Sequence, residues 1–122
     1  MTARNLFLDF GEEEKPPRYT VAQIKNLGLN RSAENLQTLI ELYNVVEEID
    51  VRREIVSSIG RQRDDEIILE FIRENVFCCG FMDLVYQMYR TCLYKSRTNL
   101  EFKELGAEIK AHFNNEVLDK ML

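Results

Sequence analysis

The chain has 122 residues and a mass of 14.4 kDa, enough for one domain with its own hydrophobic core. Its residues are 45% hydrophobic and 30% charged, and five Gly with two Pro leave little material for the many turns of an all-β fold. No apolar run is long enough to span a bilayer and no basic segment precedes an apolar one at the start, so we expect a cytoplasmic protein that does not contact membranes.

Residues 1–18 are predicted to form an acidic, partly ordered arm, and residues 19–122 a helical domain. The stretch "GEEEKPPR" contains three consecutive Glu and a Pro pair, which argue against a packed element. The apolar side chains of the arm, above all Leu6, Phe7 and Phe10, are candidates for contact with a partner protein or with the body of the chain itself.

Capping residues bound the first two predicted helices. Thr20 stands three residues before Gln23, which is the spacing of a capping box, and Gly28 has the position of a left-handed helix terminator. Ser32 is the next N-cap, and the helix that follows should run to about Glu48. Its buried stripe at spacings of three and four residues comprises Leu36, Leu39, Ile40, Tyr43 and Val46.

The stretch "IDVRREIVSSIG", residues 49–60, predicts a third helix. Asp50 is expected to be its N-cap, because a short carboxylate can accept hydrogen bonds from the free amides of the first turn. Gly60 lies near the end of this helix. Its inward stripe comprises Val51, Ile55, Val56 and Ile59.

Three more helices are expected after residue 63. Asp64 or Asp65 should cap the fourth helix, and residues 81–95 form a fifth whose apolar residues cover more than half the circumference, as in the middle of a stack. A capping box of Thr98 with Glu101 should begin the last helix, in which no terminator precedes residue 122. The sequence therefore predicts an all-α fold of five or six helices.

The apolar spacing of residues 32–60 recurs in residues 64–95 at an offset of about 32 or 33 residues, which is close to the period of helical solenoids. The stretch "DVRREIVSSIG" resembles the second-helix signature of HEAT-like repeats, in which Asp precedes Val-Arg and the helix leads to Ile-Gly or Leu-Gly. The resemblance implies antiparallel helix pairs that form an α-α superhelix or an irregular bundle.

A second resemblance concerns the whole chain. The acidic start "NLFLDFGEEE" followed by compact helices is similar to the non-catalytic N-terminal regions of bacterial DNA amino-methyltransferases. The catalytic Pro-Pro-Tyr motif and the Gly-rich cofactor loop of those enzymes are absent from this sequence. The resemblance therefore implies an accessory piece of a DNA-modifying system, without an active site of its own.

The residues that usually carry chemistry do not form a site in this sequence. His112 is the single histidine, and Cys78, Cys79 and Cys92 have neither zinc-ligand spacing nor the spacing of a disulfide framework. Neither a nucleophile elbow nor a phosphate-binding loop occurs. We therefore predict no enzyme activity, no metal and no cofactor.

Two functional hypotheses remain open. The first is a protein-interaction module that binds another protein or a following domain, with Leu6, Phe7, Phe10, Tyr86 and Tyr94 as contacts. The second is an accessory DNA-binding domain, because residues 51–97 hold half of the basic residues of a chain with a net charge of −5. Its predicted phosphate contacts are Arg52, Arg53, Arg61, Arg63, Arg90, Lys95 and Arg97.

Overall fold

The computed structural model describes residues 18–114 and Leu118, and over these residues the chain is all-helical, as the sequence predicted. Helix α1 is short and the other five have three to four turns. The helices are α1 (Val21–Leu29), α2 (Ala33–Val45), α3 (Ile49–Gly60), α4 (Asp65–Asn75), α5 (Met82–Lys95) and α6 (Leu100–Phe113).

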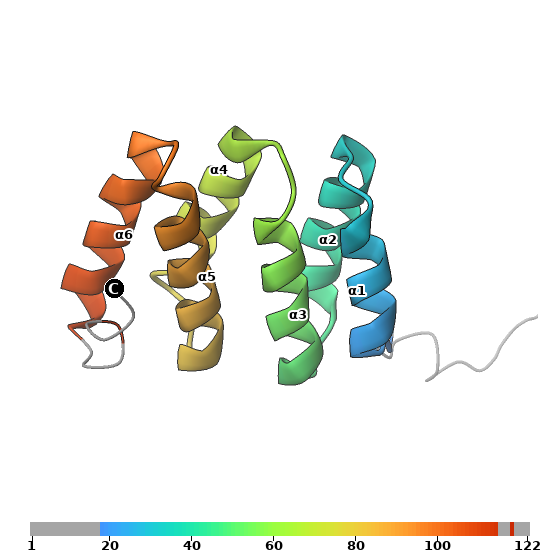
Figure 1. The fold of residues 1–122 in the computed structure, drawn as a ribbon. Coiled ribbons are helices and arrows are strands. Elements are labelled where there is room, and N and C mark those ends of the chain that lie inside the picture. The colour runs from blue at the N-terminus through green and yellow to red at the C-terminus, as the bar shows by residue number, and fades with distance from the viewer. Residues whose placement is uncertain (1–17, 115–117, 119–122) are drawn as a thin grey trace, which may run out of the picture.

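The helices form two layers (Figure 1). Helices α1, α3 and α5 lie side by side and run in the same direction, so that their C-terminal ends share one edge of the molecule. Helices α2, α4 and α6 run the opposite way. The closest helix neighbours are α1 with α3, α3 with α5, α5 with α6, and α2 with α1 and α3, while α4 lies closest to α6. We call α1, α3 and α5 the first layer and α2, α4 and α6 the second layer.

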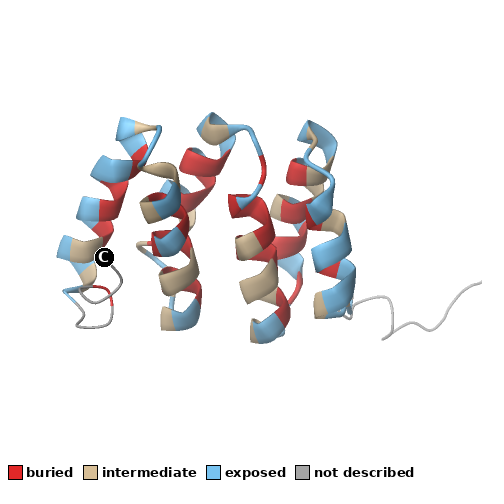
Figure 2. Ribbon diagram, in the orientation of Figure 1, coloured by how far each residue is buried: buried red, intermediate tan, exposed pale blue. Residues whose placement is uncertain are grey.

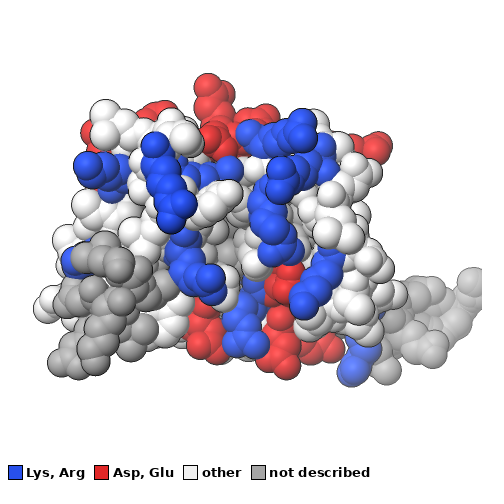
Figure 3. All heavy atoms as spheres, in the orientation of Figure 1, with Lys and Arg blue, Asp and Glu red and all other residues white. Residues whose placement is uncertain are grey.

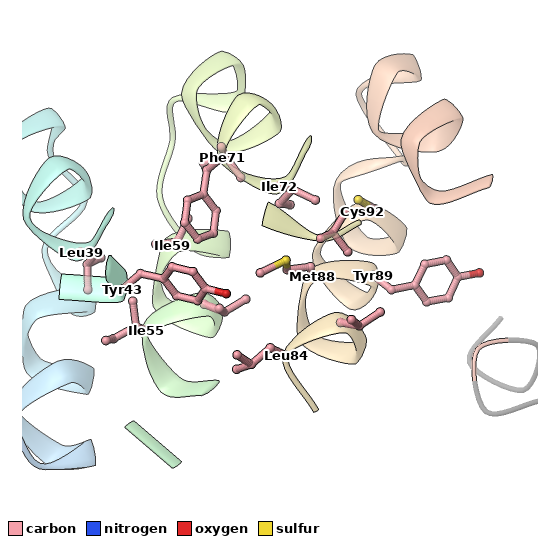
Figure 4. Close-up of a cluster of buried hydrophobic side chains, with 14 of the residues drawn as sticks. Leu39, Tyr43, Ile55, Ile59, Phe71, Ile72, Leu84, Met88, Tyr89 and Cys92 are labelled. Atoms are coloured by element: carbon pink, nitrogen blue, oxygen red, sulfur yellow. The ribbon is translucent and has the colours of Figure 1, made fainter. Parts of the chain in front are cut away.

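Apolar side chains from both layers pack in the space between them (Figure 4), and the buried residues lie on the sides of the helices that face one another (Figure 2). The predicted stripe of α3 is confirmed, because Val51, Ile55, Val56 and Ile59 are all buried. Tyr43 of α2 meets Phe71 of α4 edge to face, with ring centroids 5.0 Å apart. Helix α5 has a broad buried face, as expected for the middle of a stack, formed by Leu84, Val85, Met88, Tyr89 and Cys92.

Three of the predicted helix starts are confirmed. Thr20 and Gln23 form both hydrogen bonds of a capping box, the Thr20 hydroxyl accepting from the Gln23 amide at 3.1 Å. The Ser32 hydroxyl accepts from the amide of residue 35 at 3.0 Å, and the Asp64 carboxylate accepts from that of residue 67 at 3.3 Å. These short polar side chains satisfy amides that the helix itself leaves unpaired.

Two other predicted starts are wrong. Helix α3 begins one residue before Asp50, with Glu48 at the cap position, so the Asp50 carboxylate lies in the first turn, where it complements the positive helix end and pairs with Arg53 at 3.7 Å. At α6 the cap is Asn99, whose side chain accepts from the amide of Glu101, and the predicted box with Thr98 does not form.

Three predicted helix ends also differ from the structure. Helix α2 stops at Val45, three residues before the expected end. Helix α6 stops at Phe113, because Asn114 adopts a left-handed conformation with φ of 45°, which Asn tolerates better than most residues. Gly28 is not a left-handed terminator, since it lies inside α1 and none of the described glycines has a positive φ.

Gly28 and Gly60 instead allow close approach of the first-layer helices. A Cβ on Gly28 would stand 2.5 Å from Ser58 Oγ, and one on Gly60 would stand 2.5 Å from Thr91 Oγ1. The α1–α3 and α3–α5 contacts therefore share one design, a glycine against a small hydroxyl residue. The two contacts are separated by 32 residues on the glycine side and 33 on the hydroxyl side.

Two long polar side chains tie the connecting loops to this layer. The Gln62 side chain is 2% exposed; its Oε1 accepts from the Ser32 amide at 3.1 Å and its Nε2 donates to the Gly28 carbonyl at 3.3 Å. Lys95 repeats this 33 residues later, since its Nζ donates to the Gln62 carbonyl at 3.2 Å and to the Asp65 carboxylate at 2.8 Å. Both side chains hold the shared edge of the first layer together.

Candidate functional site

A groove lies between α3 and α5, at the edge where the first-layer helices end. It has a volume of about 530 Å³. Its floor holds Gly60, Gln62 and Thr91, which are buried, and arginines stand around it. The residues that line it are Arg31, Ser57, Gly60, Arg61, Gln62, Arg63, Gln87, Arg90, Thr91, Tyr94 and Lys95.

The groove belongs to the basic side of the molecule. Figure 3 shows Lys and Arg side chains gathered over α3 and α5 on either side of a hollow. The first-layer helices carry five basic and three acidic residues, whereas the second-layer helices carry three basic and nine acidic residues. A smaller groove between α2 and α4, of about 240 Å³, is lined by Glu70 and Glu74 instead. Although the net charge of the whole chain is −5, basic residues are in excess in the first-layer helices and acidic residues are in excess in the second-layer helices.

Three groove arginines are available to a ligand. Arg31, Arg63 and Arg90 are exposed, and none of them makes an ion pair within the described part of the chain. They come from the α1–α2 loop, the α3–α4 loop and α5, so three separate segments bring guanidinium groups to one groove. A guanidinium can bind a carboxylate or a phosphate through two parallel hydrogen bonds.

Arg61 differs from these three because the protein already neutralises it. Its Nη2 donates to Glu54 Oε2 at 2.9 Å and to Ser58 Oγ at 3.0 Å, and its Nη1 donates to Ser57 Oγ at 2.9 Å. These bonds fix the Arg61 side chain along the wall of the groove. Arg61 therefore contributes more to the shape of the groove than to its positive charge.

Arg52 and Arg53, both predicted phosphate contacts, do not line the groove. The Arg52 guanidinium lies 4.3 Å from the centroid of the Tyr43 ring, and its Nε is buried without a hydrogen-bond partner among the described residues. Arg53 lies between Asp50 and Asp83, at 3.7 and 3.5 Å from their carboxylates. Both side chains are thus engaged within the body of the protein.

Lys95 and Arg97 lie at the end of α5. The Lys95 side chain is 11% exposed, and its bonds to Asp65 and to the Gln62 carbonyl make it a structural link on the groove wall. Arg97 is exposed, and its guanidinium lies 5.8 Å from the centroid of the Tyr94 ring. Of the seven predicted basic contacts, four line the groove, namely Arg61, Arg63, Arg90 and Lys95.

Of the two described residues that were predicted to contact a protein, Tyr94 lines the groove and Tyr86 does not. Tyr94 is 67% exposed and lines the groove beside the arginines. Tyr86 is half-buried against the core, so part of its surface is already used. Leu6, Phe7 and Phe10 lie outside the described residues.

Arg31, which lies in the turn between α1 and α2, was not among the phosphate contacts predicted from the sequence. The turn comes to the groove because Gln62 binds the Ser32 amide and because the Asn35 side chain donates to the Asn30 carbonyl at 2.9 Å. The repeat offset was the signal that could have found it, since Arg31 precedes Arg63 by 32 residues. Each residue follows the end of a first-layer helix.

The described cysteines are free thiols in three different environments. Cys78 is exposed, Cys79 is half-buried and Cys92 is buried. Burial raises the pKa of the Cys92 thiol from 9.0 to about 12, against a smaller lowering by Arg73. Burial likewise raises the pKa of the Tyr43 hydroxyl from 10.0 to about 12, although Arg52 opposes the shift.

Neither metal-binding nor membrane-spanning features stand out among the described residues. Over this part of the chain no three His, Cys, Asp or Glu side chains gather as they would around a metal ion. None of the described helices has both the length and the apolar character needed to cross a bilayer. The ring of His112, an exposed residue, packs edge to face on Phe77 at 5.1 Å and on Phe113 at 4.8 Å.

Comparisons with protein-family models, with curated proteins and with solved structures gave no match.

Proposed function

We propose that the protein is a non-catalytic helical interaction module, which holds an acidic segment of a partner protein in the groove between α3 and α5. The observation that carries the proposal is the set of three exposed arginines, Arg31, Arg63 and Arg90, which converge on one groove without ion pairs to described residues. An acidic peptide would supply the missing carboxylates, and a following domain of the same polypeptide could supply them as well.

The other groups of the groove suit a peptide. Ser57, Gln87 and Thr91 offer hydrogen-bonding side chains beside the arginines, and Tyr94 offers an exposed aromatic face. Tyr and Arg are the residue types that contribute most to protein interfaces, because they combine large contact area with directed polar groups. The buried Gln62 and the fixed Arg61 hold the groove in shape before a ligand arrives, which lowers the entropy cost of binding.

Charge reversal tests the proposal with poly-L-glutamate as the probe. The R63E/R90E variant should bind it about tenfold more weakly than the parent protein, since each lost ion pair is worth about 0.2–1 kcal/mol and repulsion adds to the loss. The matched control is R73E/K103E, which makes the same charge change on the second layer. Fluorescence anisotropy at low salt gives the affinities. Equal weakening by both double variants would mean that net charge, and not the groove, controls binding.

A nucleic-acid partner is the second candidate, as an accessory DNA-binding or positioning domain of a bacterial DNA-modifying system. It is favoured by the recurrence of arginine at one edge, where Arg31, Arg63 and Arg97 follow the ends of α1, α3 and α5. Phosphate contacts from such a row would give binding that weakens steeply with salt.

A short DNA duplex separates the two candidates. If phosphates bind the groove, the R63E/R90E variant should lose affinity for every duplex sequence alike, and the slope of log affinity against log salt should fall by about 1 to 2. Arg61 is a poor choice for this test, because its reversal would also leave Glu54 unpaired. If the parent protein has no measurable affinity for the duplex at low salt, the DNA hypothesis is eliminated.

A further inference from the structure

We infer that the acidic partner of the groove between α3 and α5 is a second copy of this chain, which presents the groove between its own α2 and α4 to the arginines. We call these two sites the basic groove and the acidic groove. The inference rests on the proposed function and names the partner, since both place carboxylates against Arg31, Arg63 and Arg90. It also gives a role to the acidic groove, which the proposed function leaves unused.

The acidic groove lies in the second layer, on the face opposite to the basic groove (Figure 1). Glu70 and Glu74 line it from α4; both are exposed, and neither makes an ion pair with a described residue. Glu66 precedes Glu70 by four residues, so three carboxylates follow one another at a rise of about 6 Å along α4. Like charges at this spacing repel one another, so a cation that binds here relieves a repulsion within the helix.

Two side-chain amides add hydrogen-bond acceptors to these carboxylates. Asn44 and Asn75 line the acidic groove, and each donates through its amide nitrogen to a carbonyl of its own helix, that of Ile40 at 3.2 Å and that of Phe71 at 2.7 Å. Both amide oxygens are left without a donor from the described residues. A guanidinium has five N–H donors and no acceptor, so an arginine side chain supplies the donors that this groove lacks.

The floor of the acidic groove suits the apolar part of an arginine side chain. Ile40, Ile67 and Phe71 line the groove between its polar walls, and Ile67 is still 36% exposed. The methylene stem of an arginine can cover such apolar surface while the guanidinium stays with the carboxylates at the rim.

The basic groove carries arginines of the required kind. Arg31, Arg63 and Arg90 are exposed and have no ion pair with a described residue. The excess of basic residues in the first-layer helices and of acidic residues in the second-layer helices favours the same contact, the first layer of one copy against the second layer of the next.

This contact joins two different surfaces, so it does not close. The two grooves lie on opposite faces of the molecule, and one pair of copies therefore cannot use all four grooves at once. Each added copy leaves one basic and one acidic groove free at the ends, as in other head-to-tail assemblies. The structure thus assigns to the chain a linear association that rests on exposed ion pairs and weakens with salt.

Sedimentation equilibrium of the full chain gives the first test. At low salt, the weight-average mass should rise above the 14.4 kDa of one copy as the protein concentration increases. It should return to that of one copy at about 1 M salt, where charges are screened beyond about 3 Å. A parent protein that remains monomeric at low salt would overturn the inference.

A mixing experiment tests the two grooves together. The R63Q/R90Q variant lacks the basic groove and the E70Q/E74Q variant lacks the acidic groove, so each alone should associate about tenfold more weakly than the parent. An equimolar mixture should recover association, because the intact groove of one variant meets the intact groove of the other, and should stop at twice the mass of one copy. Recovery also shows that both variants are folded. A mixture no more associated than its components, from a parent that does associate, would contradict the inference.

The matched control is E104Q/E108Q, which makes the same charge change as E70Q/E74Q at exposed positions of α6, away from the acidic groove. It should associate as the parent does. If both variants lose association equally, net charge controls it and the acidic groove does not.

The inference and the proposed function fail in different ways. A monomeric parent that still binds poly-L-glutamate through Arg63 and Arg90 would overturn the inference and leave the proposed function in place. Recovery of association in the mixture, by a protein that does not bind the polymer, would keep the second copy as partner and exclude a flexible acidic segment.

Discussion

A methyl group on Gly60 would stand 2.5 Å from Thr91 Oγ1 and 3.2 Å from Thr91 Cγ2, distances at which nonbonded atoms repel. The β-branched Thr91 cannot turn both atoms away, because its χ1 is restricted within a helix. The backbones of α3 and α5 therefore approach each other more closely here than they could if position 60 carried a Cβ atom.

We predict that G60A destabilises the protein by about 1–3 kcal/mol, because a well-packed contact must open to admit the methyl group. The G60A/T91A variant should regain part of this loss, since the nearest atom left would be the Cβ of residue 91 at 3.4 Å. Urea unfolding followed by circular dichroism measures both. The control is G106A, whose new Cβ would meet Cys92 Cβ at an ordinary 3.5 Å and should gain helix propensity. A G60A variant as stable as the parent would contradict the packing argument.

Because of the buried Cys92 thiol, the free energy of unfolding should fall as the pH rises in the alkaline range. Its folded pKa of about 12 exceeds the ordinary 9.0, so the unfolded chain releases the thiol proton first as pH rises. The stabilisation is complete below pH 9 and is lost as pH approaches 12, at no more than about 1.4 kcal/mol per pH unit.

The unfolding free energy should therefore fall more steeply between about pH 9 and pH 10.5 in the parent than in a C92A variant. Tyr43 contributes in the same direction, but only above its ordinary pKa of 10.0. Urea titrations at several pH values give the two slopes. If the slopes are parallel, the thiol does not keep its proton in the folded protein.

At the scale of the elements, polar side chains of low exposure bind backbone groups of the connecting loops. Gln62 bonds to the Ser32 amide on one side and to the Gly28 carbonyl on the other. Without these bonds, two backbone groups at the α1–α2 turn would be left without partners, and each unsatisfied buried group costs about 1–3 kcal/mol. Gln62 thereby fixes the position of Arg31 at the groove.

We expect Q62L to lower the unfolding free energy by about 2–4 kcal/mol, because leucine has similar volume but no polar atoms. The control Q37L changes an exposed glutamine of α2 whose side chain donates to Glu41, and it should cost a few tenths of a kcal/mol. The Q62L variant should also bind poly-L-glutamate less tightly, since Arg31 loses its anchor. A Q62L protein with parental stability would show that water or a neighbouring side chain replaces the amide.

The elements show how far the sequence determines this structure. Helix positions and the stripe of Val51, Ile55 and Ile59 were predictable, because the periodicity of an amphipathic helix is a local property. The role of Gly28 was not, since it depends on Ser58, which lies thirty residues away. Glycine is common just after helix ends, which favoured Gly28 as a terminator. The close contact between α1 and α3 instead keeps Gly28 within the helix.

The candidate site was predictable only in part, for a similar reason. The basic residues near the ends of the third and fifth predicted helices indicated a charged surface, and four of the seven do line the groove. Sequence could not separate the exposed Arg63 from the largely buried Lys95, because the ion pair of Lys95 with Asp65 spans thirty residues. The contribution of Arg31 depends on Gln62 in the same way.

At the scale of the whole molecule, the most extensive contacts between the described helices join neighbours in the stack. Helix α3 is surrounded by α1, α2 and α5, whereas α1 and α6 lie at the two ends. In stacks of this kind, stability is the sum of individual helix units and the interfaces between neighbours. Units at the ends therefore open more readily than units in the middle.

Hydrogen exchange should reveal this gradient. The amides of Ile55 and Ile59 in α3 should exchange most slowly, and those of α1 and α6 should exchange faster by opening without global unfolding. Mass spectrometry of peptic fragments, or NMR, resolves the helices. Equal protection across all six helices would instead show that the molecule opens as a single cooperative unit.

The two glycine-to-hydroxyl contacts have a consequence for how such a chain can change in length. Excision of residues 29–60 would join Gly28 directly to Arg61 and would bring Gly28 opposite Thr91, the place that Gly60 holds now. The shortened stack would pack again through an equivalent glycine-to-hydroxyl contact. A duplication of the same residues would instead lengthen the stack and add another arginine to the shared edge. Because the two contacts are equivalent, helix units can be removed or added, and the length of the basic edge can change, while the same type of packing is kept.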